Sequence, residues 1–234
     1  MGTAILVLGK SGSGKSTSLR NFAPDEVGIF NILGKPLPFR GGAKFPQANR
    51  PAYAQIFDAL RTAQGRCYVI DDSTYLMQNE NFNRAKEKGY EKFTEIAMHF
   101  QQLISAAIST GPDTIVYFLH HVDEDMNGNE KVMTIGKMLD EKWNIAGACP
   151  VVIDCVVEDG QHFFITANNG RNLAKAPMGS LPEKMDNDLK AVDTALREYW
   201  GMKPIKDVEP DGAKNQVTKP SQRWSVFARA DTNS

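Results

Sequence analysis

The feature that most constrains this chain of 234 residues is an octapeptide near its amino terminus. Residues 9–16 read Gly-Lys-Ser-Gly-Ser-Gly-Lys-Ser and match G-x-x-x-x-G-K-[ST] at every fixed position. An apolar run at 3–8 precedes the motif and predicts a buried strand, and a helical pattern follows from Lys15 to Phe22. Glycines let successive backbone N–H groups converge on phosphate oxygens, and a helix amino terminus adds partial positive charge. The motif therefore predicts a phosphate-binding loop between a strand and a helix.

The chemistry of this loop predicts the contacts of a bound nucleotide. Lys15 is expected to reach the terminal phosphates of ATP, and the Ser16 hydroxyl is expected to coordinate Mg²⁺. The predicted nucleotide-binding set is Gly9, Lys10, Ser11, Gly12, Ser13, Gly14, Lys15, Ser16 and Thr17.

Two carboxylates follow another predicted strand. The apolar run Cys67–Ile70 ends at Asp71-Asp72, an arrangement typical of the second magnesium-binding element of phosphate-loop proteins. One carboxylate would hold Mg²⁺ together with Ser16, and its neighbour would polarise an attacking water. Asp71 is the predicted metal ligand, and both acids join Lys15 in the predicted catalytic set. Which acid fills which role stays open, because Asp72-Ser73 also fits the alignment.

The next apolar strand ends at His120-His121. A polar residue at this position is expected to sense the terminal phosphate, and His120 is the predicted catalytic candidate. The alternative is a histidine that ends a strand and hydrogen-bonds a loop carbonyl.

The remaining pattern predicts an α/β fold with a mostly parallel sheet and helices on both faces. Apolar runs predict further strands at 27–33 and 114–119. Helical spacing predicts helices at 52–63, 91–109 and 183–200. Asn127-Gly128 and Asp159-Gly160 predict two antiparallel hairpins, and 34–51 is predicted to be a loop.

The predicted domain covers residues 1–202, and 203–234 is predicted to be a flexible polar tail. No apolar run approaches the roughly 18–20 residues that span a bilayer, so we expect no membrane association and a cytoplasmic location.

The distribution of charge is more informative than its total. The chain has 27 basic and 28 acidic residues, which excludes a globally basic mode of holding nucleic acid. Residues 31–57 nevertheless contain no acid, and aromatic residues alternate with their cations. Cations bind backbone phosphates and aromatic rings stack on unpaired bases, so the composition of this segment suits single-stranded nucleic acid. The candidate contacts are Lys35, Arg40, Lys44 and Arg50. The alternatives are a solvated loop and a lid over the nucleotide.

These motifs together resemble a family of phage-encoded RecA-like ATPases grouped with the Sak-type single-strand annealing proteins. The resemblance covers about residues 3–200. It is carried by the stretches GKSGSGKST, NILGKPLPFRG, VIDDSTYLM and LHH. It implies a RecA-like core and an ATPase that acts on single-stranded DNA in phage recombination or replication, in the host cytoplasm. It also implies a homo-oligomeric ring or filament, and a single-strand-binding protein is a further candidate partner.

The chain departs from the RecA-like pattern at two places. Such proteins often complete the site with a Lys-x-Arg pair from the neighbouring subunit. Lys175 matches the lysine, but residue 177 is proline, so Arg171 is the candidate substitute; the alternative is that both are solvated surface charges. A catalytic glutamate after the second strand is missing, which implies slow hydrolysis or use of Asp72.

The sequence is therefore compatible with three functions. The first is a DNA-stimulated ATPase that promotes annealing or strand exchange. The second is an ATP-gated loader or adaptor for a replication protein, with little hydrolysis, which the two departures favour. The third is a nucleotide kinase, which would need an arginine-rich lid that the sequence does not display.

Overall fold

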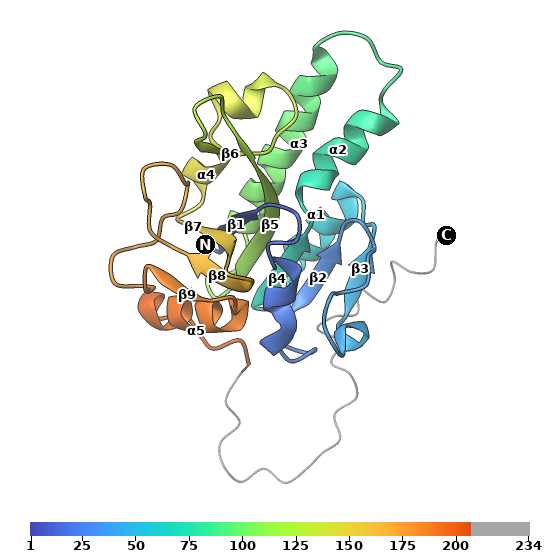
Figure 1. The fold of residues 1–234 in the computed structure, drawn as a ribbon. Helices are drawn as coiled ribbons and strands as arrows, with labels where there is room; N and C mark the ends of the chain where they lie inside the picture. The colour runs from blue at the N-terminus through green and yellow to red at the C-terminus, as the bar shows by residue number, and fades with distance from the viewer. Residues whose placement is uncertain (207–234) are drawn as a thin grey trace, which may run out of the picture.

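A computed structural model describes residues 1–206, and within them nine strands form one sheet (Figure 1). The order is β3-β2-β4-β5-β1-β7-β8-β9, with β6 paired to the carboxyl end of β5. Six strands run parallel: β3 (Gln47–Asn49), β2 (Gly28–Asn31), β4 (Cys67–Asp71), β5 (Ile115–Glu124), β1 (Thr3–Gly9) and β7 (Val151–Glu158). Three run antiparallel to their neighbours: β6 (Glu130–Val132), β8 (Gln161–Ile165) and β9 (Lys184–Asp186). The predicted α/β class and its antiparallel extension are confirmed.

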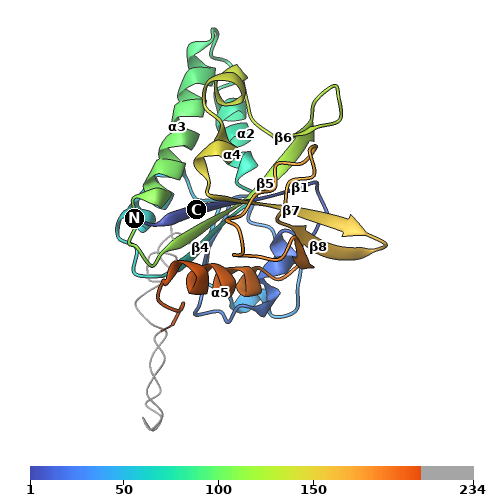
Figure 2. The same cartoon turned by 90° about the vertical axis from the view of Figure 1, so that its left-hand side faces the viewer.

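Helices cover both faces of the sheet, as predicted (Figure 2). One face carries α1 (Tyr53–Arg61), α2 (Thr74–Asn83), α3 (Glu91–Ile108) and α4 (Ile145–Ala148). The other face carries the 3₁₀ helix η1 (Ser16–Asn21) and α5 (Leu189–Trp200). Two further short helices are η2 (Gly42–Lys44) and η3 (Met138–Lys142). Successive strand side chains point to opposite faces, so Leu6 packs beneath α3 and Val7 packs on the side of η1.

The position of β5 determines which side chains meet at the carboxyl edge of the sheet. β5 lies between β1 and β4, with Gly9 opposite His121 and Ile70 opposite Phe118. The phosphate loop after β1, the histidines ending β5 and the acids ending β4 therefore lie side by side. Ligands of open parallel sheets bind at this edge.

Three elements differ from the sequence predictions. The predicted loop at 34–51 contains strand β3, and α2 was not predicted because its sequence TYLMQNENFN buries just one short apolar patch. The predicted start of the last helix at residue 183 is wrong. Residues 184–186 form β9, and the helix begins after Asp188, whose side chain accepts hydrogen bonds from Lys190 N (3.0 Å) and Ala191 N (3.2 Å). An aspartate with that geometry fixes a helix amino terminus.

The carboxyl end of the described chain stays packed on the domain past the predicted boundary at residue 202. Lys203 N donates to Asp113 Oδ1 at 2.9 Å, and Ile205 is 7% exposed within the core on the α5 side. Residues 207–234 of the predicted tail lie outside the described part. Among residues 1–206, no helix combines the length and the apolar character needed to cross a bilayer.

Candidate functional site: the phosphate loop and its carboxylates

The backbone of the phosphate loop requires glycine where it passes closest to the β7–β8 hairpin. Gly14 has a φ of +103°, which side-chain-bearing residues rarely adopt. A Cβ atom at Gly14 would also lie 2.8 Å from His162 Nδ1. The conformation and the close contact together explain this glycine of the motif.

The loop presents several hydrogen-bond donors. Within residues 1–206, the backbone N–H groups of Ser11, Gly12, Gly14 and Lys15 donate to no protein acceptor. The Lys15 side chain is 6% exposed, and its ammonium donates to Gly9 O at 2.7 Å and Lys10 O at 3.0 Å. Burial lowers the pKa of Lys15, and the nearby Asp71 and Asp72 carboxylates partly offset that effect. A ring of donors around a buried ammonium fits a polyphosphate.

The loop is held in place by groups that lie far away in sequence. The Ser13 carbonyl accepts hydrogen bonds from Cys155 Sγ at 3.1 Å and from His162 Nδ1 at 2.7 Å. Asn187 Nδ2 lies 3.1 Å from the same sulfur. Burial raises the pKa of Cys155 to about 11, so the thiol keeps its proton and acts as a donor. Sequence reasoning missed these supports because no local pattern links them to the loop.

The predicted magnesium ligands meet. Ser16 Oγ donates to Asp71 Oδ1 at 2.8 Å, joining the start of η1 to the end of β4. Asp71 is 5% exposed, and burial raises its pKa to about 6 despite the Ser16 hydrogen bond. A hydroxyl and a carboxylate in contact, beside a phosphate-binding loop, form the donor set that a hard divalent cation prefers.

Asp72 is held beside Asp71 by a strained backbone and two side chains. Its φ is +60°, in the left-handed region. Lys35 Nζ lies 3.1 Å from Asp72 Oδ2, and His121 Nε2 lies 3.5 Å from Asp72 Oδ1. Burial opposes ionisation, but the His121 and Lys35 contacts outweigh it and lower the pKa of Asp72. The structure therefore places Lys35, a predicted DNA contact, at the carboxylates.

His120 and His121 point to opposite faces of the sheet. His120 has no exposed surface, and its ring lies against Phe100 of α3. Its Nδ1 lies 2.8 Å from Ser73 Oγ and its Nε2 2.8 Å from Met133 O. Burial lowers the pKa of His120 to about 3, so the ring is neutral. The predicted sensor His120 thus points to the face that carries α3, and the pleat points His121 to the face that carries η1.

The other predicted contacts are dispersed. Lys10 is exposed and pairs with Glu124 at 2.5 Å, while Thr17 lies in the first turn of η1. Arg171 and Lys175 are exposed in the segment between β8 and β9, where Lys175 exchanges backbone hydrogen bonds with Val152 at 2.8 and 2.9 Å.

The remaining predicted DNA contacts do not gather at one edge. Lys44 ends η2, before β3 begins, whereas Arg50 follows the carboxyl end of that strand. Because β3 runs parallel to β2, these cations lie at opposite ends of the strand, and Arg40 lies in the connection that runs between the two edges. Arg50 is the member of this set that shares the edge of the phosphate loop.

A second buried carboxyl group lies next to the phosphate-loop strand. Asp154 of β7 lies opposite Leu8 of β1 and is 2% exposed. Burial, followed by the adjacent Glu130 carboxyl, raises its pKa from 3.8 to about 8. The folded state thus binds this proton more tightly than the unfolded state, so its contribution to stability is complete below about pH 4 and is lost as the pH rises through about 8.

Asp154→Asn is therefore expected to raise the midpoint of thermal unfolding at about pH 9, where the wild-type carboxyl must ionise in a buried site. At about pH 5 the gain should be much smaller, because the folded wild-type group is then neutral and the unfolded group is little more than one pH unit above its pKa of 3.8. Thermal scans across this range measure the effect, and each kcal/mol corresponds to about 2–4 °C for a chain of this size. The exposed Asp58→Asn is the control. Parallel pH curves for Asp154→Asn and the wild type would contradict the assignment.

No matching relative guides the interpretation of this site, which therefore depends on its own geometry. Neither a protein-family model nor a curated protein sequence matches the chain. The features available for that interpretation are the parallel sheet, the donor-rich loop and the contact between Ser16 and Asp71.

Proposed function

We propose that this chain is a RecA-like ATPase that binds Mg²⁺-ATP and acts on single-stranded DNA in phage recombination or replication. The observation that carries the nucleotide part is the 2.8 Å hydrogen bond from Ser16 to Asp71, formed beside the free N–H groups of the loop. The family resemblance supports the DNA part and the assembly into a ring or filament. The near-neutral total charge of −1 favours modest, salt-sensitive DNA affinity built by assembly.

The residues present fit ATP and Mg²⁺. Lys15 and the backbone N–H groups of the loop would hold the phosphates, and Ser16 and Asp71 would hold the cation. ATP supplies the phosphoryl group that is transferred to water. Asp72 is the candidate to orient that water, and His121 positions Asp72 on the loop side of β5.

A second candidate function is the ATP-gated adaptor that hydrolyses little ATP. The observation that favours it is the ion pair between Lys35 and Asp72, which neutralises the acid that a fast hydrolase would use. The chain also lacks a glutamate at the end of β2, where Asn31 hydrogen-bonds Lys35 O at 2.6 Å.

ATP turnover measured with and without oligo(dT), together with oligo(dT) binding measured with and without ATP, separates these functions. We expect slow turnover that rises with DNA, and DNA binding that strengthens with ATP. If DNA neither binds nor changes turnover, the recombination function is wrong. Nucleotide binding with negligible turnover in all conditions favours the adaptor, and transfer of phosphate to an added nucleoside favours the kinase.

A further inference from the structure

A cavity separate from the phosphate loop opens at the carboxyl edge of the sheet, beyond the ion pair of Lys35 with Asp72. Its volume is about 670 Å³, and it lies between the turn after β2, the start of α1 and one side of α2. Its apolar lining is buried or half-buried and comprises Ile32, Leu33, Pro51 and Leu76. A cavity of this size with an apolar floor suits a flat aromatic ligand of nucleobase size.

Arg50 stands at the mouth of this cavity in a constrained conformation. Its φ is +52°, its backbone N–H donates to Asn31 O at 2.8 Å, and its Nε lies 3.4 Å from Leu33 O. The side chain crosses Gly34, where an added Cβ would lie 3.2 Å from Nε. Within residues 1–206 the terminal guanidinium nitrogens have no partner, so they are available to an anion. A strained, exposed arginine held by its own backbone is typical of a ligand clamp.

Two neutral amides also line the cavity. Asn79 and Asn83 lie one helical turn apart on α2, and their amides hydrogen-bond to no other described residue. Each amide offers donors and an acceptor that match those on the edge of a base.

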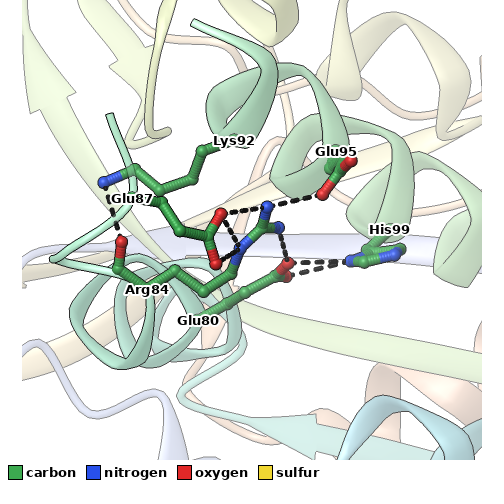
Figure 3. Close-up of polar contacts among 6 residues, drawn as sticks. All are labelled: Glu80, Arg84, Glu87, Lys92, Glu95 and His99. Carbon is green, nitrogen blue, oxygen red and sulfur yellow. Dashed lines mark hydrogen bonds and ion pairs between the residues drawn. The ribbon is translucent and has the colours of Figure 1, made fainter. Parts of the chain in front are cut away.

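The other charged residues that line the cavity, Glu80 and Arg84, already form ion pairs with neighbouring side chains (Figure 3). Arg84 pairs with Glu80 at 3.1 Å, with Glu87 at 2.6 Å and with Glu95 at 2.5 Å. His99 Nδ1 lies 2.9 Å from the Glu80 carboxylate. This network fixes α2 against α3 and leaves Arg50 as the available cation lining the described cavity.

We propose that this cavity binds one nucleotide unit, with its base on the apolar floor and its phosphate on Arg50. Asn79 and Asn83 would hydrogen-bond the base edge. The chemistry is shared by a free mononucleotide and by one unit of single-stranded DNA, and naming the strand as the source rests on the proposed function. An unpaired base stacked beside a cation is the usual mode of single-strand binding.

The test is equilibrium binding of fluorescent oligo(dT) to the full-length protein, with dTMP as competitor. Arg50→Gln is expected to weaken binding about tenfold, equivalent to about 1.4 kcal/mol, and to reduce the salt dependence by about one phosphate contact. Asn79→Ala, which removes one of the two amides, is expected to weaken it about threefold. Arg61→Gln is the matched control on α1, because Arg61 is exposed and pairs with Asp58, and it should bind like the wild type.

The outcomes separate this site from the proposed function. If oligo(dT) binds and Arg50→Gln binds as tightly as Arg61→Gln, the cavity assignment is wrong while the ATPase proposal stands. If dTMP binds in an Arg50-dependent manner and oligo(dT) does not bind, the nucleotide site stands and the DNA function is wrong. If neither ligand binds the wild-type protein, the cavity proposal is overturned. Circular dichroism and the midpoint of thermal unfolding, compared with those of Arg61→Gln, check that Arg50→Gln is folded.

Discussion

Lys15→Ala is expected to lower ATP turnover about 10²–10³-fold, because it removes a preorganised positive charge from a buried phosphate site. The ammonium is 6% exposed and fixed by the carbonyls of Gly9 and Lys10, so neither water nor a neighbouring lysine replaces it. Nucleotide affinity should fall as well, and titration with a fluorescent ATP analogue measures that loss separately from turnover.

The loop itself contains the matched control. Lys10 belongs to the same motif and carries the same charge, but its ammonium is exposed and paired with Glu124. Lys10→Ala should therefore keep turnover within a few-fold of the wild type, since exposed pairs contribute about 0–1 kcal/mol. Equal losses in the two variants would show that general positive charge, rather than the Lys15 position, controls nucleotide binding. Unchanged turnover in Lys15→Ala would refute the phosphate-loop assignment.

The largest expected effect on stability comes from Arg197→Met. Arg197 is 3% exposed and its guanidinium pairs with the fully buried Asp193 of the same helix at 2.5 Å. It also donates to the carbonyls of Asp113 at 2.7 Å, Lys203 at 3.0 Å and Arg66 at 2.5 Å. Its removal leaves the buried Asp193 carboxylate without its cation, which typically lowers the free energy of unfolding by about 3–5 kcal/mol.

Urea unfolding of Arg197→Met and of Arg61→Met gives the comparison. Arg61 has an aspartate partner at 2.9 Å, but both side chains are exposed, so its loss should change the free energy of unfolding by less than about 1 kcal/mol. The double variant that also carries Asp193→Leu should recover part of the loss, because it removes the orphaned charge. A loss of less than about 1 kcal/mol in Arg197→Met would mean that the pair does not anchor α5.

The sequence predicted the parts of the fold that depend on local pattern. The strand before Gly9 and the acids after Ile70 lie where their apolar runs placed them, because a fully buried strand needs a continuous apolar segment. The helix α2 escaped prediction, since its outer face is polar and its buried face is short. Likewise, residues 184–186 follow a helical pattern but pair as β9, because β8 offers an open edge to them.

The sequence predicted which motifs form the site, but not how the individual side chains are oriented within it. Ser16 and Asp71 meet as expected, because the parallel strands β1 and β4 bring the residues that end or follow them to the same edge of the sheet. The choice between His120 and His121 depends on the pleat of β5, which two adjacent histidines do not reveal. Lys35 lies in the turn after β2 and pairs with Asp72. The charge pattern of residues 31–57 instead predicts Lys35 as a DNA contact.

The turn that follows β2 contributes to both proposed ligand sites. Lys35 at its end pairs with Asp72, while Leu33 lines the second cavity and accepts a hydrogen bond from Arg50. A ligand that both breaks the Lys35–Asp72 pair and shifts the backbone of this turn would also change the orientation of Arg50. Thermodynamic linkage makes such coupling symmetric. If ATP changes the affinity of the cavity for a nucleotide by some factor, that nucleotide changes the affinity of the protein for ATP by the same factor. The four residues 32–35 would then connect the two proposed binding equilibria.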